Sequence, residues 1–316
     1  MTEATPALET RTVGARVGTA FIAFGVGILA AALGILPWLI GGGTLPLQNL
    51  WVADTPWNDM PFALLPVSQY EATTIFVLLL MGGVFAGLAV HIIARRGSFA
   101  AWPAALGLFA VQLVAVVQSY TVVSNGLGLT NSLDRRTFVY FAGMLGGAIV
   151  ALVVAQAAFW IASRRAIGPV ALAIGLAAVP FAAWLSEAAH SLFGTSGIPM
   201  PALTALHWLP AVIAAAALVW CGVRPAKRIA VWVAVLVGVW VIPALFTTIQ
   251  YGLGMRVLHG DLREMASASG QVLPLALGEQ LVPALVALAL AVIGTVIVEL
   301  VRRRNAAPVA EPTPAP

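Results

Sequence analysis

The chain has 316 residues, of which 61% are hydrophobic and only 9% are charged, and its mean hydropathy is +0.98. A soluble domain carries roughly 25% charged residues, because a surface that faces water needs them. The composition therefore excludes a soluble globular protein and predicts an all-α, polytopic transmembrane helical bundle.

Eight apolar runs are long enough to cross a bilayer, since a spanning helix needs about 20 apolar residues. The first follows Arg11 and Arg16 and is too long for the apolar core of a signal peptide, so we interpret it as a span. The predicted spans are 18–41, 72–94, 99–123, 138–162, 167–189, 204–223, 229–251 and 277–300. They form a single transmembrane domain over 18–304, between a cytoplasmic segment, 1–17, and a Pro-rich tail, 305–316, predicted to be disordered and cytoplasmic.

The basic residues fix the orientation of these spans. Most of them lie in the segments that an alternating path of the apolar runs places on one side of the membrane: Arg11, Arg16, Arg95, Arg96, Arg164, Arg165, Arg224, Lys227, Arg228, Arg302, Arg303 and Arg304. The other side holds only Arg135, Arg136, Arg256 and Arg263. The positive-inside rule then predicts that both termini are cytoplasmic, in a bacterial plasma membrane.

The longest outer segment, 42–71, is rich in proline and contains Trp51 and Trp57. Tryptophan favours the headgroup layer, so this segment is expected to lie on the membrane surface. Within the spans, three pairs of small residues at a spacing of four predict that helix backbones approach closely. These pairs are Gly83-x3-Gly87, Gly143-x3-Gly147 and Ala171-x3-Gly175.

The third span has a polar face in its outer half. Gln112 and Ser119 are seven residues apart and share a helix face, and Gln118 lies beside them. An unpaired amide in lipid costs several kcal/mol, so this face must meet either other helices or a water-filled pathway. Gln156 in the fourth span is a candidate partner for Gln112.

The outer ends of the last four spans carry further polar residues: Glu187, His190, His207, Gln250 and Glu279. A proline lies a little deeper in each of these spans, and prolines kink helices, so the outer halves could splay into a polar vestibule. The alternative is that these residues only meet headgroups and water. Glu187 and His190 have the Glu-x-x-His spacing of some metal ligands, but no second such motif occurs and no metal site is predicted.

Two hairpins share a pattern that predicts a repeat, although an Ala-, Val- and Leu-rich chain also produces such matches by chance. Spans five and seven read Gly175-x4-Pro180-x6-Glu187 and Gly238-x4-Pro243-x6-Gln250. The following spans, six and eight, contain Pro210-Ala and Pro283-Ala.

Arg135 and Arg136 break the positive-inside pattern at the outer start of the fourth span. Either they are solvated arginines at a helix start, or they form a cationic site for an anionic solute or lipid headgroup.

The function predicted first is transport of a small or amphipathic solute, as in a permease. The alternatives are an outer-leaflet enzyme acting on a lipid or lipid-linked substrate, and a non-catalytic assembly partner or sensor. No Walker, Gly-x-Ser-x-Gly, His-Glu-x-x-His or Cys-x-x-Cys motif occurs, so no cofactor is expected and an enzyme is the less favoured class. The predicted partners are the lipid bilayer and a second membrane protein, and not nucleic acid, because the arginines do not form one basic patch.

Overall fold

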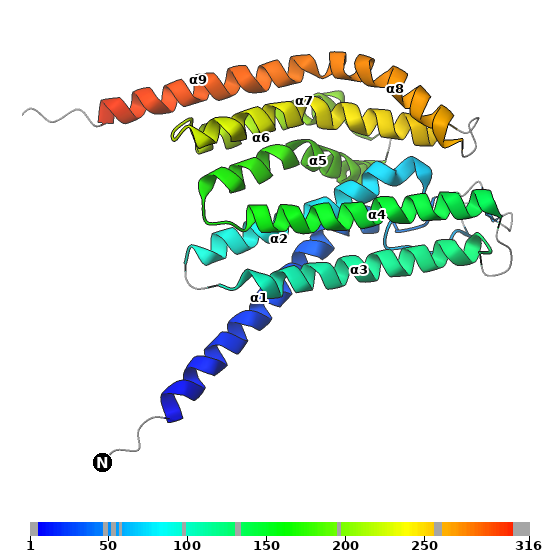
Figure 1. The fold of residues 1–316 in the computed structure, drawn as a ribbon, viewed down its shortest axis with the longest axis horizontal. Helices are drawn as coiled ribbons and strands as arrows, with labels where there is room; N and C mark the ends of the chain where they lie inside the picture. Colours follow the sequence, from blue (N-terminus) through cyan, green and yellow to red (C-terminus); the bar gives the residue numbers. More distant parts are fainter. Residues whose placement is uncertain are drawn as a thin grey trace, which may run out of the picture.

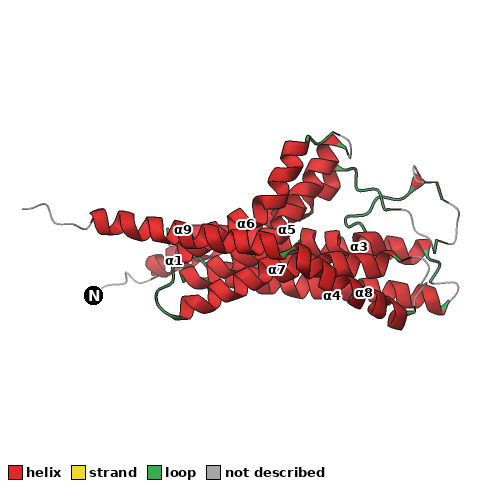
Figure 2. Cartoon of the chain, turned by 90° about the horizontal axis from the view of Figure 1, so that it is seen from above, coloured by secondary structure: helices red, strands yellow, loops and turns green. Residues whose placement is uncertain are grey.

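The structure is a computed structural model that describes residues 6–46, 50–51, 55–56, 59–96, 99–129, 134–194, 197–255 and 261–305. These residues form helices and connecting segments, with one isolated bridge between Thr44 and Phe62 and no strand (Figure 2). The elements are α1 (Pro6–Ile40), η2 (Gln69–Glu71), α2 (Ala72–Ala94), α3 (Ala101–Gly126), α4 (Arg135–Ala162), α5 (Ile167–Phe193), α6 (Met200–Cys221), α7 (Lys227–Gly254), α8 (Leu262–Glu279) and α9 (Leu281–Asn305). Eight helical stretches are long and apolar enough to cross a membrane, which confirms an all-α, multi-pass membrane protein.

The predicted spans agree with these helices to within a few residues, apart from the two ends of the chain. α1 begins at Pro6, inside the segment predicted to precede the membrane, and its apolar part starts at Gly18. The last predicted span, 277–300, is preceded by a helix that the sequence analysis missed, α8. Its Arg263, Glu264 and two serines hide it from a search for apolar runs. Of the predicted tail, Asn305 ends α9, and residues 306–316 lie outside the described residues.

The start of α1 and the end of α9 lie at the same end of the bundle (Figure 1). The connections α2–α3, α4–α5 and α6–α7 lie at that end too, as an even number of crossings requires. We call it the terminal end, and the opposite one the distal end. The twelve basic residues predicted to be cytoplasmic belong to the terminal end, and the cytoplasmic orientation of that end stays a prediction.

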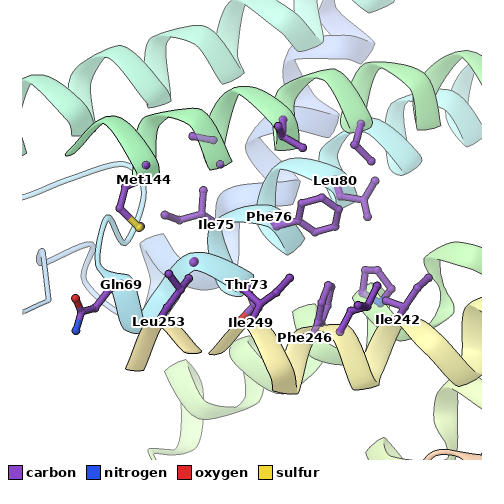
Figure 3. Close-up of a pocket in the computed structure, with 18 of the residues that line it drawn as sticks. Gln69, Thr73, Ile75, Phe76, Leu80, Met144, Ile242, Phe246, Ile249 and Leu253 are labelled. Atoms are coloured by element: carbon purple, nitrogen blue, oxygen red, sulfur yellow. The ribbon is translucent and has the colours of Figure 1, made fainter. Parts of the chain in front are cut away.

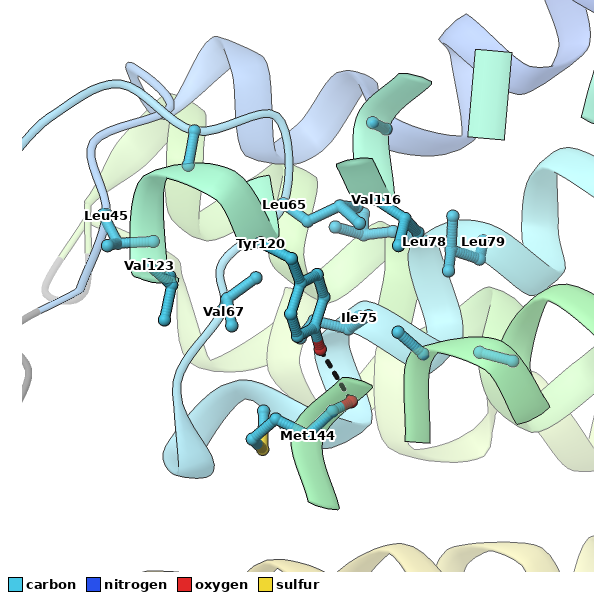
Figure 4. Packing of buried hydrophobic residues seen from close by; sticks show 14 of the residues in the cluster. Leu45, Leu65, Val67, Ile75, Leu78, Leu79, Val116, Tyr120, Val123 and Met144 are labelled. Carbon is cyan, nitrogen blue, oxygen red and sulfur yellow. Dashed lines mark hydrogen bonds between the residues drawn. The ribbon is translucent and has the colours of Figure 1, made fainter. Parts of the chain in front are cut away.

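A hydrophobic core fills the distal half between α1, α2, α3 and α4. In it, Leu78 of α2 lies near Val116 of α3 and Leu65 of the α1–α2 connection, and Val123 of α3 belongs to the same cluster (Figure 4). Tyr120 of α3 reaches across this core toward α4. Large and small buried apolar side chains together therefore fill the distal space between α2, α3 and α4.

Part of the connection between α1 and α2 is buried in the bundle, whereas the whole segment 42–71 was expected to lie on the membrane surface; Trp57, one of the two tryptophans behind that expectation, lies outside the described residues. Ala63, Leu65 and Val67 are fully buried, and Ser68 is 1% exposed. The polar face of α3 makes this burial possible. The backbone N–H of Leu64 donates to Gln118 Oε1 (2.9 Å) and that of Leu65 donates to Ser119 Oγ (2.8 Å). Backbone N–H groups that are buried outside a helix need hydrogen-bond acceptors. The polar face of α3, expected to meet other helices or water, supplies them to this connection instead.

Two of the three small-residue pairs pack as predicted. A Cβ at Gly83 or Gly87 would collide with the α4 backbone at Ala155 or Phe159, and one at Gly175 would collide with Val235 of α7. These glycines set how closely the helices approach.

The third pair does not pack against a helix. A Cβ added at Gly143, Gly146 or Gly147 would meet no described atom within 4 Å. The reason is that α4 uses a neighbouring face, which includes Ala148, Ala151 and Ala155, to pack inside the bundle. The glycine face of α4 is left open.

Candidate functional site

The open glycine face of α4 is one wall of a long groove. The cavity has a volume of about 1140 Å³ and is bounded by α4 on one side and α7 on the other, with α2 and α5 between them. Figure 3 shows Met144 on the α4 side and Ile242, Phe246, Ile249 and Leu253 on the α7 side. Ile75, Phe76 and Leu80 of α2 lie between the two sides and form the floor of the groove. Pockets for drug-sized ligands hold about 300–1,000 Å³, so this groove accepts a large ligand.

The α4 wall is one continuous helix face. Its lining residues recur every three or four positions: Arg135, Arg136, Val139, Tyr140, Gly143, Met144, Gly147, Ala148, Val150, Val154, Ala157, Ala158 and Ile161. From Arg135 to Ile161 this face is about 39 Å long at 1.5 Å per residue. The hydrocarbon core of a bilayer is about 30 Å thick, so this face of α4 is long enough to span it, whereas the α7 wall covers only the distal part, from Ile242 to Met255.

The groove is open along its side. Val150 on the α4 wall is 58% exposed, and Leu245 and Ile249 on the α7 wall are 41% and 45% exposed. α4 packs on α2, α3 and α5, and α7 packs on α5, α8 and α9, whereas the two walls are not packed on each other in the described part of the chain. The lipid around the protein therefore has direct access to the groove.

Contacts at the bottom of the groove hold the two walls apart. Phe76 of α2 meets Phe246 of α7 edge to face, with ring centroids 5.9 Å apart. Gln250 Nε2 of α7 donates to the carbonyl oxygen of Tyr70 in η2 (3.2 Å). These contacts join α7 to α2 and η2 rather than to α4, so they leave the space between the walls open.

The polar side chains of the groove are concentrated at its distal mouth. Arg135, Arg136, Gln69 and Tyr140 line that mouth, and Thr73 lies one turn deeper. Beyond this point, every residue of the walls and bottom is apolar down to Ile161. The site is therefore amphipathic, cationic at one end and hydrocarbon-like along the rest.

Two aspartates near the mouth are occupied by helix capping. The Asp134 carboxylate accepts from the backbone N–H and the hydroxyl of Thr137 at the start of α4. Asp261, which also lines the groove, accepts from the N–H groups of Arg263 and Glu264 at the start of α8. Within the described residues, neither carboxylate forms an ion pair with Arg135 or Arg136.

A second, smaller cavity of about 350 Å³ lies between α5, α6, α7 and α9. Its lining contains His207 and three of the four prolines singled out in the sequence, Pro210, Pro243 and Pro283. Ser186 and Gln280 supply its other polar groups. Glu187, His190, Gln250 and Glu279 do not line it.

Gln112, Ser119 and Gln156, the uncharged candidates of the third and fourth spans, line neither cavity. Gln112 is 2% exposed, and its Nε2 donates to the carbonyl oxygen of Leu79 in α2 (2.7 Å). Ser119 is fully buried and binds the α1–α2 connection. Among the described residues, two buried amide atoms have no hydrogen-bond partner, Nε2 of Gln156 and Oε1 of Gln112.

Glu187, His190 and Gln250 lie toward the distal ends of α5 and α7, whereas Glu279 lies at the α8–α9 junction, away from the distal start of α8. Glu187 is near enough to Glu71 and His190 to interact with their charges, and His190 Nδ1 donates to the carbonyl oxygen of Ser186 (2.7 Å). Glu279 is exposed at the end of α8. Nowhere in the described ranges do three His, Cys, Asp or Glu side chains come together as they would to hold a metal ion.

Comparisons with protein-family models, with curated proteins and with solved structures find no match to this chain. What the site can do therefore follows from its own geometry and chemistry. A groove with hydrocarbon-like walls, open to lipid and cationic at one end, suits a ligand that is itself amphipathic.

Proposed function

We propose that the protein is a permease-like membrane protein that binds an amphipathic solute in the groove between α4 and α7 and moves it across the bilayer. The observation that carries this proposal is the groove itself, which combines a polar mouth with an apolar surface as long as the membrane is thick. Arg135 and Arg136 are the residues that would receive the polar part of the solute.

The layout of the groove supports movement as well as binding. An apolar chain that slides along α4 and α7 stays against Gly147, Val150 and Ile249 and never leaves a hydrocarbon-like surface. The open side allows the solute to enter from either leaflet without passing through the buried core of the bundle. The polar partners of the solute lie only at the mouth, so a headgroup that crosses must leave Arg135 and Arg136 while its chains stay on the apolar walls.

The test is leaflet transfer in proteoliposomes. Purified protein is reconstituted with a trace of fluorescently labelled phosphatidylglycerol or phosphatidylcholine, with and without an imposed proton gradient. Dithionite then bleaches the label in the outer leaflet. We expect the remaining inner-leaflet label to become accessible faster than in protein-free vesicles. Equal rates with and without protein, for both lipids and both gradients, would refute transport through this groove.

A pair of variants on one helix makes the test specific. Gly147→Phe places a ring in the open part of the groove, where no described atom lies within 4 Å, so we expect it to abolish transfer without unfolding the protein. Val153→Phe is the control, because Val153 is 63% exposed and does not line the groove. If both variants transfer lipid at the original rate, the groove is not the route.

The two other functional classes stay predictions. An outer-leaflet enzyme would need Glu187, His190, His207 or Glu279 at a substrate, and of these only His207 lines a cavity, the smaller one. If the protein is an assembly partner or sensor, another protein would dock in the groove. Photocrosslinking from the groove distinguishes that case from lipid binding.

A further inference from the structure

We infer that the groove is a binding site for one membrane phospholipid with an anionic headgroup, held with the headgroup on Arg135 and Arg136 and the acyl chains along the glycine face of α4. This inference rests on the proposed function, since it names the class of solute. It is nevertheless a statement about binding, which holds or fails independently of transport.

The charge of the mouth selects an anionic headgroup. Arg135 and Arg136 both line the groove, and no carboxylate pairs with them in the described part of the chain. The nearby Asp134 and Asp261 carboxylates keep their charge but accept hydrogen bonds from backbone N–H groups at helix starts, so the two arginines remain the strongest hydrogen-bond donors of the mouth. Arginine suits phosphate because its planar group offers several N–H donors at once. Gln69 and Tyr140 add amide and phenol groups at the same mouth.

The arginines lie at the depth where a phospholipid carries its headgroup. They form the first turn of α4, and the apolar wall begins one turn later at Val139. An acyl chain that starts beside Arg136 therefore runs directly onto Gly143 and Gly147. The absence of side chains at these glycines makes room for a flexible chain between larger neighbours such as Met144 and Val150.

A lipid suits the groove better than a transmembrane helix of a partner does. A partner helix would need to supply, at its start or end, a group that neutralises two adjacent arginines. A phospholipid supplies apolar chains and a charged phosphate in one molecule, and it is already present in the membrane.

The binding test uses native mass spectrometry of the full-length protein in detergent. Phosphatidylglycerol and phosphatidylcholine with the same acyl chains are titrated in turn. We expect tighter binding of phosphatidylglycerol, and a loss of about 10- to 30-fold in the double variant Arg135→Gln/Arg136→Gln, since an arginine near a headgroup contributes about 1 kcal/mol. Phosphatidylcholine, whose phosphate charge is balanced by its own choline, should lose less. The matched control is Arg263→Gln, an exposed arginine at the same end that does not line the groove.

The location test is photocrosslinking in cells. A photoreactive amino acid replaces Val150 in the groove or, as the control, Val153 outside it. We expect a phospholipid adduct at Val150, enriched in anionic lipids relative to that at Val153. A polypeptide adduct specific to Val150 would overturn the inference in favour of a protein partner. Equal binding of the two lipids, or equal losses in the double variant and in Arg263→Gln, would overturn the choice of an anionic headgroup.

The two proposals fail differently. Tight and selective binding of phosphatidylglycerol without any transfer in proteoliposomes would refute the permease function and leave the binding site intact. Transfer that Gly147→Phe blocks but Arg135→Gln/Arg136→Gln leaves unchanged for both lipids would refute the anionic site and leave the permease function intact.

Discussion

The hydroxyl of Tyr120 on α3 donates a hydrogen bond of 2.7 Å to the carbonyl oxygen of Met144 on α4 (Figure 4). Both residues are buried, and the Tyr120 ring also packs edge to face on Phe141 at 5.7 Å between centroids. Met144 lines the groove, so this hydrogen bond connects the buried core to the groove wall. It fixes the part of α4 that carries Gly143 and Gly147.

Tyr120→Phe removes this hydrogen bond and keeps the ring. We expect the free energy of unfolding to fall by about 1 kcal/mol, because buried hydrogen bonds in membrane bundles contribute about that much. Thermal unfolding in detergent measures the loss. Tyr251→Phe is the control, since Tyr251 is 43% exposed. An unchanged melting temperature in Tyr120→Phe would show that the α3–α4 spacing does not depend on the hydroxyl.

Substitution of glycine by alanine should change stability in opposite directions in the glycine pairs of α2 and α4. Gly83→Ala places a methyl group against the α4 backbone at Ala155, and we expect a loss of about 1–3 kcal/mol from overpacking. Gly147→Ala points into open space and should be neutral or stabilising, since alanine favours a helix by up to about 1 kcal/mol over glycine. The two melting temperatures, measured in the same detergent, decide the matter. Equal losses would mean that Gly147 is packed after all.

The α1–α2 connection should loosen when its partners on α3 are removed. Gln118→Ala/Ser119→Ala leaves the N–H groups of Leu64 and Leu65 without acceptors in a buried site. We expect about 2–5 kcal/mol of destabilisation, and new reaction of an introduced Ala63→Cys with a water-soluble maleimide. Thr121→Val is the control, because Thr121 donates only to Val117 of its own helix. An Ala63→Cys that stays unreactive would contradict the role given to Gln118 and Ser119.

The orientation of the bundle is open to direct measurement. The only native cysteine is the buried Cys221, so Cys221→Ala provides a background for single cysteines. Met200→Cys at the distal end should react with an impermeant maleimide in intact cells, whereas Arg304→Cys at the terminal end should react only after the cells are permeabilised. The reverse pattern would place the termini outside, and Arg135 and Arg136 would then face the cytoplasm.

The sequence was sufficient to locate the helices but not the groove, and the reason is physical. A span is defined by apolarity over about 20 residues, which the composition displays directly. A groove depends on which apolar residues face empty space and which face the bilayer. Val150 lines the groove and Val153 does not, although the two residues are chemically identical.

Polar residues gave a partial guide. Arg135 and Arg136 were identified because they break the charge pattern, and they lie at the mouth of the groove. The polar face of α3 was identified as well, and Gln118 and Ser119 bind a buried connection whose depth the sequence did not indicate. No pattern identified the α7 wall, because Ile242, Phe246 and Ile249 resemble any lipid-facing residues.

Two positions on the α4 wall are glycines, which have no side chain and therefore no rotamers. When a ligand departs, Gly143 and Gly147 offer no side chain that could swing into the vacated space and close it. A change of rotamer at these two positions cannot close the recess, so the lipid site that we propose would need no rearrangement of their side chains before it refills.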